Sequence, residues 1–287
     1  MQITSGLPEG FNAGAYDMIV VGAGYAGAVC ARRLAETIGY RVAVLERRSH
    51  IAGNAYDCTD EAGILIHEYG PHIYHTFNER VHNFLSRFTK WTDYQHKVLA
   101  NINGTLMPVP FNHASLKLAF GDERGEELYQ KLVETFGKDV KVPIMELRKK
   151  NDPDLAEVAD YVYENVFLHY TMKQWGQRPE DIDPNTTARV PVFLSRDDRY
   201  FQDAFQGMPQ EGYTPMFERM LDHPNITVEL GCDALKRLDV SGEQIKVDGE
   251  VFDGPVIYTG QADELFRFQY GPLPYRTLDF RFETLPQ

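Results

Sequence analysis

The sequence is poor in cysteine and tryptophan, with three and two among 287 residues. Cys30, Cys58 and Cys232 are odd in number and widely spaced, so a disulfide-stapled miniprotein and a paired-cysteine metal site are both excluded. This cysteine usage is typical of a reducing compartment, and we expect a cytoplasmic location. The remaining composition, 43% hydrophobic and 25% charged, is that of an ordinary globular protein with a substantial core.

Basic residues are also scarce relative to acidic ones, so the formal net charge is −13. An acidic field repels phosphate backbones, so we expect no nucleic-acid partner. Any anionic ligand must be held by local cations or backbone N–H groups. The longest weakly polar stretch, residues 18–31, is interrupted by three glycines and is shorter than the roughly 20 apolar residues of a membrane helix. We therefore expect no membrane partner, and residues 1–15 predict a flexible leader rather than a secretory signal.

Several catalytic motifs are missing. The chain has no Gly-x-Ser-x-Gly elbow, no His-Glu-x-x-His helix, no Walker phosphate loop and no Cys-x-x-Cys pair. Their absence argues against the corresponding hydrolase and metalloenzyme classes. A reaction carried by a bound organic cofactor would need few catalytic side chains, because the protein then supplies binding, orientation and electrostatics.

The strongest motif present is a glycine turn between an apolar strand and a helix of small residues. Gly22 permits the tight turn, Gly24 lets the backbone approach a pyrophosphate, and Gly27 lets the helix pack closely on the strand. The next strand ends at Glu46, 19 residues after Gly27, where a carboxylate can accept hydrogen bonds from a ribose diol. The unit predicts an adenine-dinucleotide site; the alternative is a tightly packed turn without a ligand.

Beyond this unit the pattern changes twice. Residues 112–188 show long helical periodicities and predict a helical insertion, in which the basic residues 148–150 are most simply a solvated helix face. After residue 190, short extended runs bounded by Gly, Asp and Pro predict sheet. Two strands cannot complete the nucleotide-binding sheet, so some of these runs should return to it and others should form an antiparallel layer.

Three other segments could carry chemistry. His72 and His75 have a spacing that suits metal ligation, but no third ligand stands out, and a rigid turn with hydrogen-bonded imidazoles is the simpler interpretation. The aromatic residues around Trp175 could stack on a base or sugar, or belong to a core. Arg189 in a loop could clamp a diphosphate, or pair with an aspartate at the surface.

Six blocks in order resemble the bacterial-type, FAD-dependent UDP-galactopyranose mutases. They are the glycine turn, His-Ile-Ala-Gly-Asn-Ala-Tyr at 50–56, Tyr-Gly-Pro-His-Ile-Tyr-His at 69–75, Tyr-Thr-Met-Lys-Gln-Trp-Gly at 170–176, Asp-Asp-Arg-Tyr-Phe at 197–201, and the segment 205–214. The resemblance implies an α/β fold with an FAD-binding Rossmann-like parallel-sheet domain, a helical insertion and an antiparallel sheet layer. We expect the leader at 1–15, the FAD-binding domain at 16–78 and 231–265, the insertion at 112–188, and the sheet and substrate layer at 79–111, 189–230 and 266–287.

The resemblance also implies an activity. The family interconverts UDP-galactopyranose and UDP-galactofuranose without net redox change, through attack of N5 of reduced FAD on the anomeric carbon of the sugar. The expected cofactor is therefore FAD, active in its reduced form, and the expected partners are these two nucleotide sugars and further copies of the chain in a homo-oligomer.

The resemblance assigns site residues motif by motif. Cofactor binding is implied for Gly22, Gly24, Ala26, Gly27, Glu46, Asn54, His72, Ile73 and Ala234. Substrate binding is implied for Phe167, Tyr170, Thr171, Trp175, Arg189 and Tyr200, with His96 as a contact to the sugar. Arg189 and His72 are the expected catalytic residues, and no metal is expected.

The chain departs from the family pattern in three places. Ala52 replaces a glycine, which is a mild change if its backbone angles suit alanine, and Arg196 replaces an aromatic residue and could add a cation to the substrate cleft. Family members continue past the position of Gln287 with a second diphosphate-binding arginine, substrate tyrosines and a final flavin-binding strand, so the sequence resembles one without its C-terminal portion. Two alternatives stay open: a flavin oxidase or dehydrogenase of the amine-oxidase-like group, and a catalytically inactive nucleotide-sugar-binding fragment.

Overall fold

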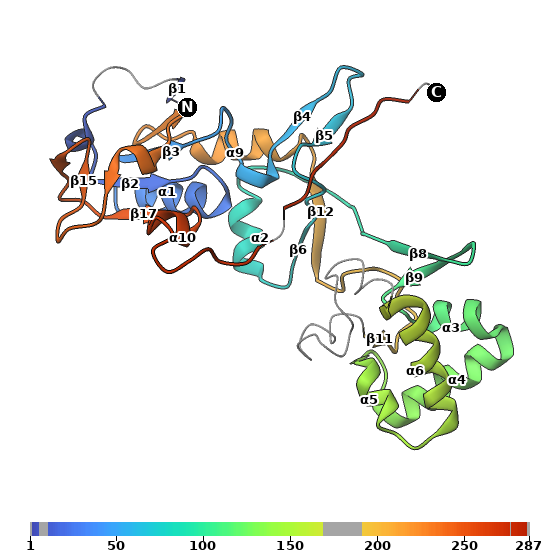
Figure 1. Cartoon of the computed structure of the whole chain (residues 1–287). Coiled ribbons are helices and arrows are strands. Elements are labelled where there is room, and N and C mark those ends of the chain that lie inside the picture. The colour runs from blue at the N-terminus through green and yellow to red at the C-terminus, as the bar shows by residue number, and fades with distance from the viewer. Residues whose placement is uncertain (1, 6–10, 169–190, 276, 286–287) are drawn as a thin grey trace. The chain divides into compact units, whose positions relative to one another are not determined.

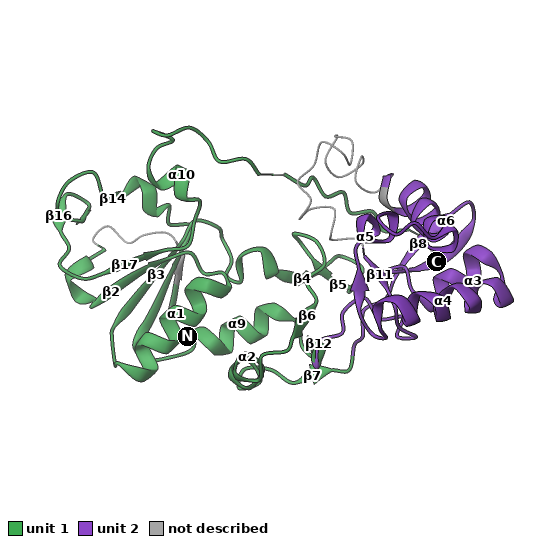
Figure 2. Cartoon of the chain, turned by 90° about the horizontal axis from the view of Figure 1, so that it is seen from below, with its two compact units in different colours: residues 1–93, 205–287 green, residues 94–204 purple. Residues whose placement is uncertain are grey.

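The computed structural model describes residues 2–5, 11–168, 191–275 and 277–285 (Figure 1). These residues form two compact units, drawn in different colours in Figure 2. Unit 1 comprises residues 1–93 and 205–287, and unit 2 comprises residues 94–204. Each unit has its own buried apolar core.

Unit 1 is built on a five-stranded sheet in which all neighbouring strands are parallel. The strand order is β1 (Gln2–Ser5), β13 (Ile226–Leu230), β3 (Val42–Glu46), β2 (Met18–Val21) and β17 (Val256–Tyr258). Every residue of β2 and β3 is buried, as expected of parallel strands that are covered on both faces. The α/β fold class with a Rossmann-like parallel sheet is confirmed.

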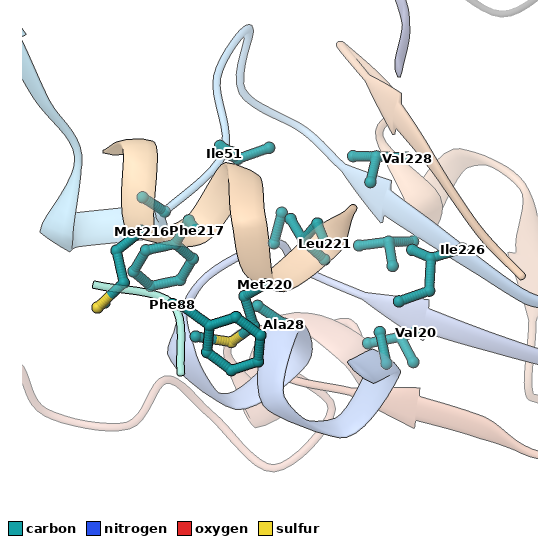
Figure 3. Packing of buried hydrophobic residues seen from close by; sticks show 14 of the residues in the cluster. Val20, Ala28, Ile51, Phe88, Met216, Phe217, Met220, Leu221, Ile226 and Val228 are labelled. Carbon is teal, nitrogen blue, oxygen red and sulfur yellow. The ribbon is translucent and has the colours of Figure 1, made fainter. Parts of the chain in front are cut away.

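Alternate residues of the central strands enter two different cores, because side chains in a strand point to opposite faces. On one face, Val20 and Val228 pack with Ala28 of α1 (Tyr25–Thr37) and Phe217 of α9 (Tyr213–Leu221) (Figure 3). On the other face, Leu45 and its neighbours pack with an antiparallel three-stranded sheet, β14 (Leu238–Asp239), β15 (Lys246–Val247) and β16 (Glu250–Val251).

The remaining elements of unit 1 are short. Two small antiparallel sheets belong to it: a hairpin of β4 (Asp57–Thr59) and β5 (Leu65–His67), and a sheet of β6 (Tyr74–Thr76), β12 (Phe205–Pro209) and β7 (Trp91–Thr92). The other elements are the helices α2 (Glu79–Leu85) and α10 (Ala262–Leu265) and the 3-10 turns η1 (Ala13–Ala15), η2 (Gly53–Ala55) and η5 (Ala234–Lys236).

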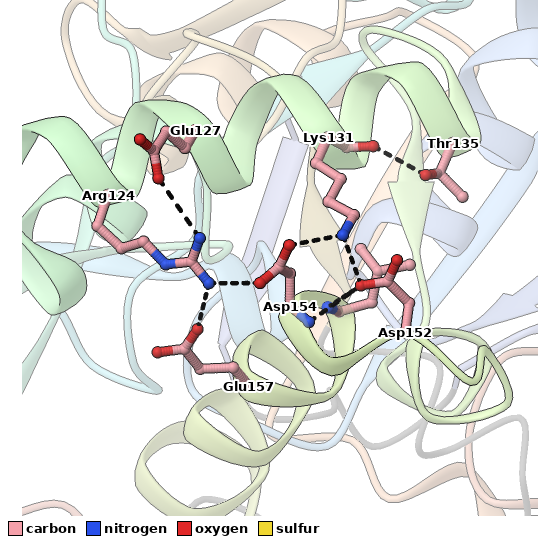
Figure 4. Close-up of polar contacts among 8 residues, drawn as sticks. Arg124, Glu127, Lys131, Thr135, Asp152, Asp154 and Glu157 are labelled. Carbon is pink, nitrogen blue, oxygen red and sulfur yellow. Dashed lines mark hydrogen bonds and ion pairs between the residues drawn. The ribbon is translucent and has the colours of Figure 1, made fainter.

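Unit 2 is mainly helical. Its elements are the hairpin β8 (Val98–Ile102) and β9 (Thr105–Val109), the helices α3 (His113–Phe120), α4 (Asp122–Phe136), α5 (Ile144–Arg148) and α6 (Pro153–Val162), the π-helix η3 (Tyr163–Phe167), and the strand pair β10 (Lys141–Val142) and β11 (Val192–Phe193). Arg124 and Lys131 on α4 bind Asp154 at the start of α6, so charged groups join the two helices at the rim of an apolar core (Figure 4).

The domain boundaries expected from the sequence differ from this division in several places. Residues 2–5, expected in a flexible leader, form β1 and pair with β13. Residues 226–230, expected in the antiparallel layer, form β13 inside the parallel sheet between β1 and β3, and Ile226 and Val228 pack into the core on one face of that sheet. Residues 79–85 and 213–221 were also expected in the antiparallel layer, but they form helices of unit 1. Residues 98–109 were expected in the same layer, but they form a hairpin that belongs to unit 2.

None of the helices in the described part of the chain has the length and hydropathy of a membrane span.

Candidate functional site

A cavity of about 530 Å³ lies at the carboxyl ends of the parallel strands of unit 1. Val21 of β2, Glu46 of β3 and Tyr258 of β17 line it, together with Cys232 just after β13. In open parallel sheets, ligands bind outside the carboxyl ends of the strands, where neighbouring connections turn to opposite faces. The volume lies in the range of cofactor and small-molecule sites.

The glycine turn forms one wall of this cavity in a conformation that a side chain would disturb. Gly22 has a φ of +99°, and a Cβ atom there would collide with the Thr259 hydroxyl. A Cβ atom on Gly27 would collide with the carbonyl oxygen of Gly22, so only glycine lets α1 start this close to β2. The turn is thus built for close packing as well as for the approach of a ligand to the backbone.

Helix α1 begins at the cavity wall. Gly24 is its N-cap residue and offers no side-chain cap, and Tyr25 and Ala26 of its first turn line the cavity. The first N–H groups of a helix have no partner within the helix, and the positive end of its dipole lies there. This wall can therefore bind a phosphate group without a basic side chain, which suits a chain of net charge −13.

Glu46 joins the end of β3 to the glycine turn. Its Oε2 accepts a hydrogen bond of 2.8 Å from the Ala23 amide, and its Oε1 accepts one of 2.8 Å from the Arg48 amide. The residue is buried, with 7% of its surface exposed, yet it lines the cavity. Each carboxylate oxygen can accept more than one hydrogen bond, so Glu46 can hold the turn and still bind a ligand hydroxyl.

Two arginines directly after β3 supply cations to the cavity. Arg48 Nη2 donates to Asn54 Oδ1 at 2.8 Å, and its guanidinium carbon lies 4.3 Å from the ring centroid of Tyr69. Its Nη1 is buried and has no hydrogen-bond partner among the described residues. Arg47 pairs with Glu264 at 3.0 Å, and both line the cavity. An unpaired buried guanidinium nitrogen is costly, and a bound phosphate or carbonyl oxygen would satisfy it.

His72 lines the cavity on a turn held by hydrogen bonds. Its amide donates to His67 Nδ1 at 2.9 Å, its carbonyl oxygen accepts from the Tyr213 hydroxyl at 3.0 Å, and its ring Nδ1 lies 2.9 Å from the Gly70 carbonyl oxygen. These contacts fit the rigid turn that the sequence predicted. No group of three His, Cys, Asp or Glu residues that could hold a metal ion occurs in the part of the chain that the structure describes.

Most of the expected cofactor-binding residues come together at this cavity. Its lining includes Gly22, Gly24, Ala26, Glu46, Asn54, His72 and Ala234. Gly27 and Ile73 are not part of the lining; Gly27 faces the Gly22 carbonyl instead. The sequence analysis missed Arg47, Arg48, Cys232, Asp233 and the run from Tyr258 to Gln261. All of them except Tyr258, the last residue of β17, lie one to three residues after a strand of the parallel sheet, and this position is the signal that could have identified them.

Two expected substrate-binding residues, His96 and Tyr200, lie together in unit 2. The Tyr200 amide donates to the His96 carbonyl oxygen at 2.8 Å, and their rings meet edge to face with centroids 5.9 Å apart. Asp198 pairs with Lys97 at 2.8 Å, which is a second contact between the segments that contain His96 and Tyr200. His96 also lies 2.9 Å from the Tyr94 hydroxyl through Nδ1.

The other expected substrate residues are described in part or not at all. Phe167 ends η3, and only its backbone is described. Tyr170, Thr171, Trp175 and Arg189 lie outside the described residues. Arg196, considered as an extra cation for the substrate cleft, pairs with Glu126 of α4 at 2.7 Å and lies over the Tyr129 ring.

Comparison with known proteins links this chain to nucleotide-sugar mutases. A family model described as UDP-galactopyranose mutase matches residues 165–287, and one described as an NAD(P)-binding Rossmann-like domain matches residues 20–88. A probable UDP-galactopyranose mutase of Klebsiella pneumoniae is 37% identical over 92% of this chain and 65% of its own length. A UDP-galactopyranose mutase of Mycoplasma pneumoniae is 34% identical over 96% of this chain and 70% of its own length.

Two further relatives extend the comparison. A dTDP-fucopyranose mutase of Escherichia coli is 35% identical over 92% of this chain and 68% of its own length. Among solved structures, a reduced UDP-galactopyranose mutase has a similar fold, with a TM-score of 0.58 and 18% identity over 88% of this chain and 57% of that one. The chain thus spans 65% to 70% of the length of these curated relatives.

Proposed function

The chain belongs to the UDP-galactopyranose mutase family, and from that premise we propose that the protein is a flavin-dependent isomerase that interconverts UDP-galactopyranose and UDP-galactofuranose. One observation carries the proposal: most of the residues that the family motifs assign to a cofactor line one cavity at the carboxyl ends of a parallel sheet. The cysteines, all three within the described residues, are free, which supports a cytoplasmic site of action.

Three features of the cavity support FAD as the cofactor. The amides at the start of α1 would bind the pyrophosphate, Glu46 would bind the ribose of the adenosine half, and the unpaired Arg48 Nη1 would donate to an oxygen of the cofactor. His72 would lie against the isoalloxazine ring. Reduced FAD, when bound, supplies the nucleophilic N5 atom that the isomerisation needs, and with a cofactor of this kind the reaction would need few catalytic side chains.

The substrate half of the proposal rests on the family motifs. We assign Phe167, Tyr170, Thr171 and Trp175 to binding of the uridine, and Arg189 to clamping of the diphosphate by its planar guanidinium. His96 and Tyr200 would contact the sugar. Their mutual hydrogen bond and ring contact support a shared role, because each limits the movement of the other.

The proposal is tested by anaerobic conversion of UDP-galactofuranose to UDP-galactopyranose by this chain with added FAD. One sample is reduced with dithionite and a matched sample is left oxidised. Product in the reduced sample only is the expected result. Product in neither sample would contradict the proposal for this chain, and equal product in both would contradict the requirement for reduced flavin.

Parallel samples separate the other possibilities. The Escherichia coli relative is named for dTDP-fucopyranose, so the same assay is run with that sugar nucleotide. Stoichiometric reduction of bound FAD by an amine or alcohol would indicate an oxidase or dehydrogenase instead. Tight binding of UDP without turnover under reducing conditions would indicate a nucleotide-sugar-binding protein.

A further inference from the structure

The backbone of His72 is held on both sides by buried or half-buried side chains. Its amide donates to His67 Nδ1 at 2.9 Å, and its carbonyl oxygen accepts from the Tyr213 hydroxyl at 3.0 Å. His67 is the last residue of β5, and Tyr213 is the first residue of α9. A wall residue of the cavity is thus tied through side chains to two separate elements of unit 1.

These contacts fix the protonation of both imidazoles. A backbone amide can only donate, so His67 Nδ1 must be unprotonated, and neutral His67 carries its proton on Nε2. A carbonyl oxygen can only accept, so His72 Nδ1 must carry a proton. When His72 is neutral, its Nε2 therefore has a lone pair, and no described residue is bonded to that nitrogen. Protonation of His67 at Nδ1 would turn an acceptor into a donor that faces the His72 amide, and the hydrogen bond would be lost.

Three titratable groups face His67. Asp57 lies directly opposite it in the β4–β5 register, the Tyr213 ring meets it edge on with centroids 5.6 Å apart, and the His72 ring is 6.5 Å away. Asp57 is already engaged, because its carboxylate accepts from the amides of Tyr213 and Thr214 at 2.5 and 2.7 Å. Burial lowers the pKa of His67 below its ordinary value, while Asp57 raises it and His72 lowers it. The neutral form that the geometry requires is therefore also favoured at neutral pH.

We infer that His67 is a positioning residue, which in its neutral form holds His72 at the wall of the cofactor cavity. The inference rests on the proposed function in so far as the cavity takes FAD. His67 is not part of the cavity lining, so it acts through the His72 backbone and not by contact with the ligand.

The inference predicts a pH dependence with a defined sign. Because the pKa of His67 in the folded chain lies below its ordinary value of 6.5, folding releases protons from this group at mildly acidic pH. The His72 anchor is intact at pH values above 6.5 and is lost as the pH falls through the lowered pKa. FAD affinity should fall over the same pH range, by about 2- to 10-fold, the factor that corresponds to one neutral hydrogen bond.

The first test uses the chain without cofactor. In the wild type labelled with 15N-histidine, we expect NMR to find the proton of His67 on Nε2 at pH 7, and the shift of the His72 amide to follow the titration of His67. His67→Asn identifies the His67 signals and supplies an amide oxygen near the place of Nδ1. A proton on His67 Nδ1 at pH 7, or a His72 amide that does not follow the His67 titration, would overturn the inference.

The second test measures FAD affinity between pH 5 and 8. His67→Asn should bind FAD with an affinity that no longer changes over the His67 titration range, and His67→Ala should bind weakly throughout. His223→Asn is the matched control, because His223 Nδ1 also accepts a backbone amide, that of Asn225, but outside the cavity lining. This variant should keep the wild-type pH profile, and a loss of the profile in both asparagine variants would contradict the inference. No FAD binding by any chain would count against the proposed function, while the NMR result would still decide the role of His67.

Discussion

Ala52 holds a backbone conformation that favours glycine. Its φ and ψ are 72° and −2°, it is 1% exposed, and its amide donates to the Ala23 carbonyl oxygen at 2.9 Å beside the cavity. The sequence comparison allowed a mild effect if the angles suited alanine, and the structure shows that they do not. A left-handed conformation costs a residue with a Cβ atom about 1–2 kcal/mol.

We expect Ala52→Gly to stabilise unit 1. The relief of about 1–2 kcal/mol is partly offset by the larger entropy of glycine in the unfolded chain, about 0.4–1 kcal/mol, so the net gain should be about 0.5–1 kcal/mol. Urea unfolding, monitored for this variant and the wild type, measures it as a higher midpoint. Ala55→Gly is the control, because Ala55 is equally buried but has no positive φ, and it should lower the midpoint. A lower midpoint for Ala52→Gly would show that the backbone strain is not the dominant effect.

At the scale of single residues, the sequence predicted those site residues whose role depends on local chemistry. The glycines of the turn and Glu46 were found because a strand, a turn and a helix follow one another within one short segment. Thr259 and Arg48 were missed, because their partners depend on tertiary structure. The Thr259 hydroxyl donates to the Val21 carbonyl oxygen between the paired strands β17 and β2, and the Arg48 guanidinium lies over the ring of Tyr69, which follows the β4–β5 hairpin. A single sequence does not show which strands become neighbours.

At the scale of elements, the N-terminus of helix α9 is capped by a side chain from a strand that is distant in the sequence. Asp57 of β4 accepts hydrogen bonds from the amides of Tyr213 and Thr214, the first two residues of the helix, and Asp57 is 3% exposed. Gly212 before the helix has a φ of +97°, and a side chain there would collide with the Asp57 carboxylate. The prediction of a sheet layer for residues 213–221 was wrong, because the residue that caps this helix lies far away in the chain and gives no local helix signal.

Asp57→Ala should therefore destabilise unit 1 by about 1–3 kcal/mol, because two buried amides lose their acceptor. Hydrogen exchange should become faster first in residues 213–221, and a lower midpoint in urea measures the global effect. Asp60→Ala is a matched control, since Asp60 also accepts two backbone amides, of Ala62 and Ile64, but in an exposed turn. An equal loss in both variants would mean that the capped helix has no special importance.

Glu126 on helix α4 makes a contact with His113 that should be sensitive to acid. A hydrogen bond from His113, supported by Gln130 and Arg196, lowers the pKa of Glu126 to about 2. A carboxyl group with a lowered pKa in the folded state adds stability above its ordinary pKa, near 4.5, and this contribution is lost as the pH falls toward 2.

The change to test is Glu126→Gln. The variant should melt at a lower temperature than the wild type at pH 6, and the gap should narrow as the pH falls from 4.5 toward 2, because the wild-type carboxyl becomes protonated as the pH approaches its lowered pKa. Circular dichroism melts across this range measure the gap. Glu123→Gln, an exposed position in the first turn of the same helix, should show almost no gap at any pH. A gap for Glu126→Gln that is as large at pH 2 as at pH 6 would exclude the charge as its cause.

At the scale of the whole molecule, the candidate site residues are divided between two units, each with its own core. The candidate cofactor cavity is formed by unit 1 alone, whereas His96 and Tyr200 belong to unit 2. The sequence predicted the first part well, since hydrophobic runs and glycine spacing specify a parallel sheet. It could not give the boundaries, because β1 and β13 join this sheet from opposite ends of the chain through pairing that leaves no local pattern.

This separation predicts that FAD stabilises one unit and not the other. A ligand that binds only the folded state at 100 times its dissociation constant adds about 2.7 kcal/mol, so amides of unit 1 that exchange only by unfolding should exchange about 100-fold more slowly. Hydrogen exchange with mass spectrometry should show this protection in β2, β3 and α1, and no change in α4 and α6.

Two variants test the role of the cavity in this protection. Arg48→Gln should reduce the protection, because the substitution removes the buried Nη1 that is proposed to donate to the cofactor. Arg41→Gln, whose side chain pairs with Asp17 and is not in the cavity lining, should leave it unchanged. Equal protection in both units would mean that FAD makes contacts outside the cavity of unit 1. This outcome would contradict the assignment of the cofactor to the carboxyl ends of the parallel sheet.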